Sequence, residues 1–361
     1  MSKVLIAGAS GLVGAAAVDK FLDDGYDVIA VSRRKPEVES DRPFEHMPVD
    51  LRDTEASKKA FSKLPDVTHV VYTAVYEKPG LIPGWQERDQ MDTNLTMLRN
   101  LMDPLTKSAK GLKHVSLLQG TKAYGVHVHP MPVPARERFP RDQHENFYWL
   151  QEDYIRDKSA KDGWTFSIWR PQLIVGPNYG VVMNLPPIIG AYAAILKEEG
   201  EPFGFPGGCP WAWEAVDTRL VANALAWGAT APQAAGETYN LTNGEVFEWR
   251  SIWPAMAKTL GVEVGPDKPV RLAEFLLDNA HVWDGIVKKH DLRPIPMSEL
   301  VGESHHYADF CFLYGATEAP MAFVSTVKIK QAGFTETYDT EESFCYWLQK
   351  LIDRKVLPPA N

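Results

Sequence analysis

Short apolar runs alternate with longer amphipathic segments in the first half of the chain, from residue 3 to about residue 175. Brief, mostly apolar runs are typical of strands buried on both faces, and the longer segments have helical spacing. This alternation predicts a parallel sheet joined by crossover helices. The predicted strands are Val4–Ala7, Asp27–Val31, Phe44–Val49, Thr68–Thr73, His114–Leu118 and Thr165–Trp169, and the predicted helices are Leu12–Asp24, Thr54–Lys63, Met91–Ser108 and Asn146–Lys161.

The pattern becomes irregular after Arg170-Pro171. Prolines and glycines crowd the segment EPFGFPGGCP, and two more helices are predicted in EWRSIWPAMAKTLG and TEESFCYWLQKLIDR. No Gly/Ser linker separates the two parts, so we expect them to interleave around a shared cleft. The fold class is therefore α/β, with a Rossmann-type doubly wound parallel sheet in residues 1–175 and a smaller, mainly helical substrate-binding lobe in residues 176–361.

A glycine-rich loop joins the first predicted strand to the first predicted helix. In a dinucleotide site, such glycines allow a tight turn, a close approach of the backbone to a pyrophosphate and close packing of helix on strand. The GxxGxxG spacing resembles that of extended short-chain dehydrogenases. The predicted cofactor residues in this loop are Gly8, Ser10, Gly11, Leu12, Val13 and Gly14.

The end of the second predicted strand indicates which nicotinamide coenzyme is bound. An NAD-preferring protein is expected to place an acidic residue there, but this chain has Ser32, Arg33 and Arg34. Two guanidiniums beside a hydroxyl suit a 2′-phosphate. We therefore predict NADPH/NADP+, with a solvated basic loop as the alternative interpretation. The resemblance to extended short-chain dehydrogenases adds Asp50 and Leu51 beside the adenine, and Thr73 and Ala74 along the dinucleotide.

Tyr148 lies in the segment NFYWLQED, where a short-chain dehydrogenase carries its catalytic tyrosine. Such enzymes place a lysine four residues later, on the same helical face, where it lowers the pKa of the tyrosine. Here that residue is Glu152, whose charge would oppose tyrosinate formation and keep Tyr148 a protonated donor. A lysine is available in LLQGTKAYG, where Lys122 follows the fifth strand and is expected to face the cofactor crevice. A loop lysine in water is the alternative interpretation.

Five segments, spread in order over nearly the whole chain, resemble the progesterone 5β-reductase and iridoid synthase family of atypical extended short-chain dehydrogenases/reductases. They are LLQGTKAYG, PRDQHENFYWLQED, SIWRPQLIVGPNYGVVMNL, AAILKEEGEPFGFPG and NLTNGEVFEWRSIWPAMAKTLG. Two details depart from the family pattern. The family's LQTGxKHY has one residue more before its lysine, and Trp149 replaces the second tyrosine of NFYY.

The resemblance implies an NADPH-dependent reductase of activated carbon–carbon double bonds in enones and enals, an oxidoreductase acting on CH–CH groups. It also implies Tyr148 and Lys122 as the catalytic residues. In conjugate reduction, charge develops on the carbonyl oxygen, so a protonated tyrosine suits the chemistry as a donor to an enolate. By the same resemblance Gln119, Ile174 and Val175 are expected beside the nicotinamide. The candidate substrate contacts are Trp149, Tyr179 and Met183.

The composition favours small molecules over nucleic acids and membranes as binding partners. A net charge of −9 argues against a surface built for nucleic acid or acidic lipid, and glycines interrupt the N-terminal apolar run too early for a membrane span. The three cysteines have no CxxC spacing, which favours a reducing, cytoplasmic location. No metal is expected, because the histidines at 127, 129, 144, 305 and 306 lack the spaced carboxylates or cysteines of a strong site.

Two other functions fit parts of the sequence. An NAD(P)-binding sugar-nucleotide epimerase or dehydratase would share the fold, but it predicts the usual YxxxK pair, which Glu152 interrupts. A redox sensor that binds NADP without turnover would also keep the glycine loop. The oligomeric state is open, with a homodimer as one option, and the sequence fixes neither the physiological substrate nor the stereochemistry.

Overall fold

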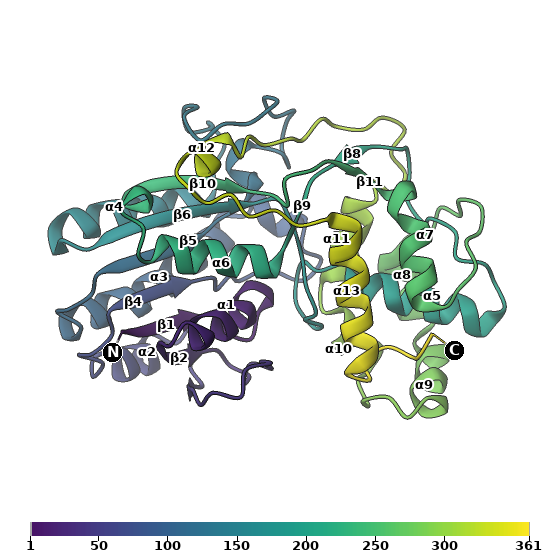
Figure 1. The fold of residues 1–361 in the computed structure, drawn as a ribbon, viewed down its shortest axis with the longest axis horizontal. Coiled ribbons are helices and arrows are strands. Elements are labelled where there is room, and N and C mark those ends of the chain that lie inside the picture. The colour runs from purple at the N-terminus through teal and green to yellow at the C-terminus, as the bar shows by residue number, and fades with distance from the viewer. Residues whose placement is uncertain (1, 361) are drawn as a thin grey trace.

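A computed structural model describes residues 2–360, and Figure 1 shows the fold. The strands of the main sheet are β1 (Lys3–Ala7), β2 (Asp27–Val31), β3 (Glu45–Met47), β4 (His69–Tyr72), β5 (His114–Leu118), β6 (Thr165–Pro171) and β10 (Glu237–Leu241). All neighbouring strands are parallel, in the order β10-β6-β5-β4-β1-β2-β3. The predicted Rossmann-type parallel sheet is therefore confirmed.

Helices cover both faces of this sheet (Figure 1). Those on one face are α1 (Leu12–Asp23) and α6 (Thr218–Gly228), and those on the opposite face are α2 (Thr54–Phe61), α3 (Arg88–Ser108) and α4 (Phe147–Asp162). Successive side chains of a strand point to opposite faces, so β1 contributes Val4 and Ile6 to one core, and Leu5 and Ala7 to the other. This burial on both sides explains why the strand is apolar throughout.

The sheet extends further than the sequence pattern predicts. β6 continues beyond Trp169 to Pro171, and β10 adds a strand whose sequence, ETYNL, is too polar to stand out. Its polar side chains are buried by contacts with distant segments. The Asn240 amide, for example, donates to the carbonyl oxygens of Ala135 and Ser325. Such contacts satisfy a buried polar group without leaving a periodic signal in the sequence.

The remaining elements form a second part of the molecule beside the sheet (Figure 1). Its helices are α5 (Pro186–Glu199), α7 (Trp249–Leu260), α8 (Leu272–Asp278), α9 (Ala280–Lys289), α10 (Met297–Val301), α11 (Ser304–Cys311) and α13 (Thr340–Asp353), and its strand pairs are β7 (Leu173–Val175) with β9 (Ala215–Asp217) and β8 (Ala212–Trp213) with β11 (Phe247–Glu248). The short elements η1 (Pro83–Gln86), η2 (Thr121–Tyr124), η3 (Pro232–Ala234) and α12 (Val327–Gln331) lie in connecting segments. None of the helices in residues 2–360 combines the length and apolar character of a membrane span.

The chain crosses between the two parts, because α6 and β10 follow residue 175 and still belong to the sheet layers. The division at residue 175 itself stays a prediction.

The loops that carry the predicted site residues leave the sheet at its carboxyl edge. Gly8 follows β1, Thr73 follows β4 and Gln119 follows β5. β1 and β4 are neighbours in the sheet. From β1 the chain continues to β2 on one side, and from β4 it continues to β5 on the other side. Where strand order reverses in this way, the diverging loops open a crevice in which doubly wound sheets bind their ligands.

Candidate active site

One cavity follows this crevice past the glycine loop and the ends of β2 and β3. Its volume is about 280 Å³. The predicted cofactor residues that line it are Gly8, Ser10, Gly11, Ser32, Arg33, Arg34, Asp50, Leu51, Thr73 and Ala74. Its walls also include Tyr76, Glu77 and the segment 180–182, which were not predicted from the sequence.

The glycine loop has the close packing that an approaching phosphate requires. Gly8 has a φ of +82°, and a Cβ there would lie 2.7 Å from the Ala74 amide nitrogen. A Cβ at Gly14 would lie only 2.1 Å from the Gly8 carbonyl oxygen. Ser10 and Gly11 precede α1 and line the cavity, so the N-terminus of the helix, with its partial positive charge, opens on it. These features fit a pyrophosphate.

The end of this cavity beside β2 is cationic. Arg33 and Arg34 are exposed there, and the buried Ser32 hydroxyl donates to the Arg34 carbonyl oxygen at 2.6 Å. The Arg34 guanidinium reaches the Gly180 carbonyl oxygen at 3.4 Å, whereas Arg33 makes no side-chain hydrogen bond within residues 2–360. A phosphate at this end would therefore meet two guanidiniums with donors to spare.

A second cavity, of about 140 Å³, lies between the end of β5, the start of α4 and the second part of the molecule. Its lining is mainly apolar and aromatic, with polar groups at one side. The lining residues are Trp85, Gln119, Gly120, Thr121, Lys122, Val126, Tyr148, Pro171, Gln172, Ile174, Met183, Trp211, Trp213, Tyr307, Phe310, Leu313, Pro320 and Ala322. Such a pocket suits a mainly apolar ligand with one polar end.

Tyr148 presents its hydroxyl to this second cavity from the first turn of α4. Opposite the hydroxyl is Gly120, where a Cβ would lie 3.2 Å from the Tyr148 Oη. Within residues 2–360, the Tyr148 hydroxyl makes no hydrogen bond, which leaves it available to a ligand. Burial, followed by the charge of Glu77, raises the pKa of Tyr148 well above its usual value. The hydroxyl therefore keeps its proton.

Lys122, in η2, lines the same cavity. Its Nζ lies 6.0 Å from the centre of the Tyr148 ring and 4.3 Å from that of Trp85. The Nζ also forms a salt bridge of 3.3 Å with the Glu77 Oε1. Burial lowers the pKa of Lys122, and the Glu77 carboxylate opposes that shift. The structure thus brings together the two residues predicted to be catalytic and adds a carboxylate.

The other predicted site residues have different positions. Gln119, Ile174 and Met183 line the second cavity. Leu12, Val13, Gly14, Val175, Trp149 and Tyr179 line neither cavity. The Trp149 indole donates to the His144 carbonyl oxygen at 3.0 Å, and the Tyr179 hydroxyl accepts from Arg293 at 2.7 Å.

A family comparison agrees with this arrangement. Residues 48–358 match the family model described as a PRISE-like Rossmann-fold domain. The chain belongs to the PRISE-like family. The match covers most of the chain and confirms the resemblance found in its sequence motifs.

Two curated proteins are similar to this PRISE-like protein over nearly their whole length. The (S)-8-oxocitronellyl enol synthase of Antirrhinum majus is 32% identical, over 99% of this chain and 93% of that protein. The 3-oxo-Delta(4,5)-steroid 5-beta-reductase of Arabidopsis thaliana is also 32% identical, over 99% of this chain and 93% of that protein. These similarities independently support the family assignment.

Solved structures share the fold of this PRISE-like protein at low sequence identity. The Bordetella bronchiseptica enzyme WbmH in complex with NAD+ has a TM-score of 0.68 and 16% identity, over 98% of this chain and 99% of that chain. The UDP-glucose 4-epimerase of Bifidobacterium longum, in complex with NAD+ and UDP, has a TM-score of 0.67 and 17% identity over the same shares. At these identities the likeness supports the fold alone.

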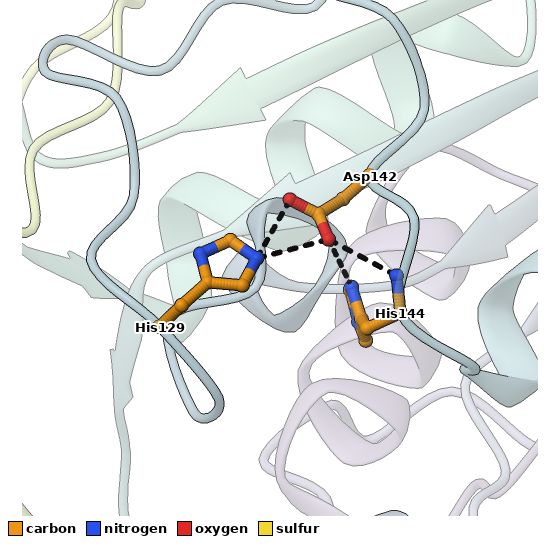
Figure 2. A group of neighbouring side chains, drawn as sticks. All are labelled: His129, Asp142 and His144. Carbon is orange, nitrogen blue, oxygen red and sulfur yellow. Dashed lines mark hydrogen bonds and ion pairs between the residues drawn. The ribbon is translucent and has the colours of Figure 1, made fainter.

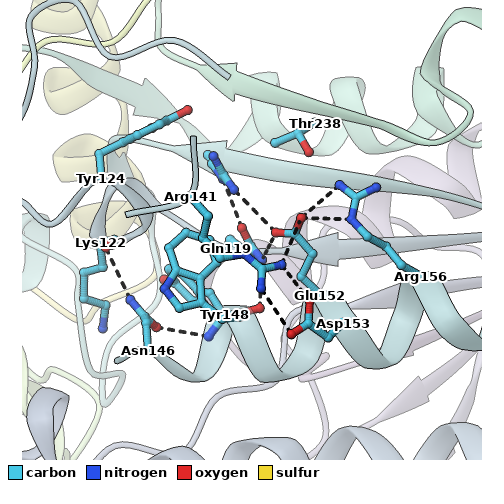
Figure 3. A network of polar contacts seen from close by, with 12 residues as sticks. Gln119, Lys122, Tyr124, Arg141, Asn146, Tyr148, Glu152, Asp153, Arg156 and Thr238 are labelled. Carbon is cyan, nitrogen blue, oxygen red and sulfur yellow. Dashed lines mark hydrogen bonds and ion pairs between the residues drawn. The ribbon is translucent and has the colours of Figure 1, made fainter. Parts of the chain in front are cut away.

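In this PRISE-like protein, Glu152 belongs to a buried polar network rather than to the catalytic cavity (Figure 3). Its carboxylate contacts Arg156 at 2.9 Å, Arg170 at 3.5 Å and Arg141 at 3.6 Å. These contacts tie α4 to β6 and to the preceding loop. The expected protonated state of Tyr148 agrees with its raised pKa, but the causes are burial and Glu77 rather than Glu152.

A carboxylate joins two of the histidines that the sequence analysis considered (Figure 2). His129 Nε2 lies 3.0 Å from an oxygen of Asp142, and His144 Nδ1 lies 2.7 Å from its other oxygen. Asp142 was not predicted from the sequence, because the loop that returns it to His129 has no periodic pattern. The potential ligand atoms of the three side chains all lie within 4.8 Å of one another, a spacing that could hold a metal ion.

Hydrogen bonds already engage the ring nitrogens of this cluster. The Asn146 Oδ1 caps α4 by accepting from the Tyr148 amide, so the Asn146 Nδ2 faces His144 Nε2 as a donor at 3.1 Å. His144 then carries its proton on Nδ1, where it donates to Asp142. We therefore interpret the cluster as support for the start of α4, and the expectation of no metal stays a prediction.

Replacing Asn146 with alanine should lower the free energy of unfolding by about 1 kcal/mol, the usual cost of losing an N-cap. It should also lower activity, because the cap fixes the first turn of α4, which carries Tyr148. Denaturant unfolding and a turnover assay would measure both effects. Asp339→Ala, which removes the N-cap of α13 away from both cavities, should affect stability only. Equal activity in the two variants would contradict this role for Asn146.

Proposed function

We propose that this protein is an NADPH-dependent oxidoreductase that reduces activated carbon–carbon double bonds in enones and enals. The observation that carries the proposal is the protonated Tyr148 hydroxyl, which has no protein partner within residues 2–360 and faces an apolar cavity that Lys122 also lines. The names of the relatives support it, because a 3-oxo-Delta(4,5)-steroid is an enone and one relative is its 5-beta-reductase.

The proposed chemistry is conjugate reduction, for which bound NADPH supplies the hydride. Tyr148 stabilises the charge that develops on the substrate carbonyl oxygen by donating a hydrogen bond. It does not need to release its proton, because the enolate takes its α-proton from water. Lys122 adds positive charge on the same side of the cavity. The mainly apolar and aromatic lining lowers the polarity around the carbonyl oxygen, which strengthens both interactions. This division of roles requires no lysine at position 152.

The residues of the first cavity fit NADPH. The glycine loop and the N-terminus of α1 would hold the pyrophosphate, and Arg33 and Arg34 would hold the 2′-phosphate. This arrangement favours the phosphorylated coenzyme.

Small enones should be better substrates than steroids. The second cavity, at about 140 Å³, is smaller than ordinary ligand pockets, which begin at roughly 300 Å³. We expect kcat/KM for 2-cyclohexen-1-one to exceed that for progesterone by about tenfold or more, since a steroid would have to displace packed side chains. Initial rates with both substrates would test this expectation. A higher value for progesterone would mean that the cavity opens widely on binding.

The direct test of the proposed function uses the purified protein, NADPH and a panel containing 2-cyclohexen-1-one, progesterone and an oxo-monoterpenal. Loss of NADPH absorbance with formation of the saturated product is expected for at least one of these. Coenzyme binding without turnover would instead favour a sensor. Reduction of the carbonyl group alone would contradict the proposed double-bond chemistry.

We also propose a cytoplasmic location. Cys209, Cys311 and Cys345 are free thiols, as is usual for proteins of a reducing compartment.

A further inference from the structure

Glu77 is a buried carboxylate beside both cavities that the reaction described above does not use. It lines the cofactor cavity, and its side chain is 0% exposed. One oxygen forms the 3.3 Å salt bridge with Lys122, and the other accepts a hydrogen bond from the Gln90 Nε2 at 2.5 Å. Both oxygens therefore have partners, as a buried charge requires.

The side chain of Gln90 is held in turn by its surroundings. It is almost fully buried on α3, and its Oε1 accepts from the Lys78 amide at 2.9 Å. Gly84 leaves the necessary space, because a Cβ there would lie 2.3 Å from the Gln90 Oε1. Because both Glu77 oxygens and the Gln90 Oε1 have partners, these contacts hold Glu77 in place beside Lys122.

We propose that Glu77 is a positioning residue that keeps the buried Lys122 ammonium charged and directed toward the substrate cavity. This inference rests on the proposed function. Within residues 2–360, Glu77 is the carboxylate that contacts Lys122, whose other neighbours include the rings of Trp85, Phe147 and Tyr148. The pair is neutral overall, so the cavity can accept an uncharged enone, while the ammonium can still stabilise an enolate oxygen.

The other titratable groups around Lys122 keep one protonation state near the working pH, so the titration of Lys122 can be followed. Burial, and then Lys122 itself, lower the pKa of His127 to about 3, so this histidine is neutral at the working pH. Burial raises the pKa of Tyr148 and of its neighbour Tyr307, so both keep their protons. Burial lowers the pKa of Lys122 and raises that of Glu77, and the charge of each residue opposes the shift of the other. Removing the carboxylate should therefore lower the pKa of Lys122 further.

Glu77→Gln should therefore lose activity as the pH rises, and regain it as the pH falls. We expect the alkaline limb of kcat for 2-cyclohexen-1-one to move down by about one pH unit or more, with about a tenfold loss on the alkaline side. A purely structural defect would lower kcat equally at every pH. Glu77→Asp, which retains the charge, should restore part of the wild-type profile. Glu87→Gln is the matched control, because Glu87 pairs with Lys78 at the surface and lines neither cavity.

A second measurement does not depend on turnover. Competitive acetylation with acetic anhydride, read by mass spectrometry of the Lys122 peptide, reports the pH at which this amine loses its proton. That pH should be lower in Glu77→Gln than in the wild type and unchanged in Glu87→Gln. An unchanged acetylation profile in Glu77→Gln would overturn the role of Glu77. A shifted profile in a protein that reduces no enone would support Glu77 as the counter-ion and contradict the proposed function alone.

Discussion

Tyr148→Phe should lower enone turnover by about a hundredfold or more, because removing one donor from an oxyanion site costs a few kcal/mol in the barrier. The substitution removes only the hydroxyl that faces the second cavity. The ring would stay packed with Met91, Phe147 and Trp149, so the start of α4 should keep its position. We expect kcat to fall while the Kd for NADPH, followed by coenzyme fluorescence, stays near the wild-type value.

Two further tyrosine variants make this result specific. Tyr239→Phe removes a hydroxyl that donates to the Gln233 carbonyl oxygen away from both cavities, and it should affect stability but not turnover. Tyr307→Phe removes the other tyrosine hydroxyl of the catalytic cavity and should have a much smaller effect than Tyr148→Phe. If Tyr148→Phe stays within a few-fold of the wild type, or if Tyr307→Phe is the more damaging change, Tyr148 is not the donor.

The sequence predicts those parts of the molecule that depend on local patterns. The glycine loop, the cationic end of β2 and the lysine after β5 follow directly from strand ends and their loops. Parallel strands place these loops at one edge, so their nearness in space follows from the fold class. Tyr148 could be assigned because the family motif around it is nearly intact.

The parts that the sequence does not predict depend on contacts between distant segments. Glu77 lies in YEKPG, which has the composition of an exposed turn, and Gln90 on α3 helps to bury it. Glu152 interrupts a motif, but its arginine partners come from a loop, from β6 and from its own helix. A carboxylate four residues from a tyrosine in the sequence is therefore a poor guide to the charge near that tyrosine in the structure, which here comes from Glu77.

Replacing both Arg33 and Arg34 with alanine should reverse or abolish the preference for NADPH. Hydrogen bonds to charged groups contribute about 1.5–3 kcal/mol each, and both guanidiniums are exposed, so we discount that range for solvent screening. We expect kcat/KM with NADPH to fall by about a hundredfold, and kcat/KM with NADH to change by less than about threefold, since NADH has no 2′-phosphate. Initial rates with each coenzyme at a fixed enone concentration would measure the ratio.

Ionic strength and a neighbouring lysine distinguish phosphate recognition from a general loss of charge. Salt screens exposed charges, so the wild-type preference for NADPH should weaken as ionic strength rises, while the double variant should respond little. Lys35→Ala removes the next cation along the chain, which lies over the Phe44 ring and lines neither proposed site, and it should leave the ratio unchanged. An equal loss with both coenzymes in the double variant would mean that the arginines support the loop and do not read the phosphate.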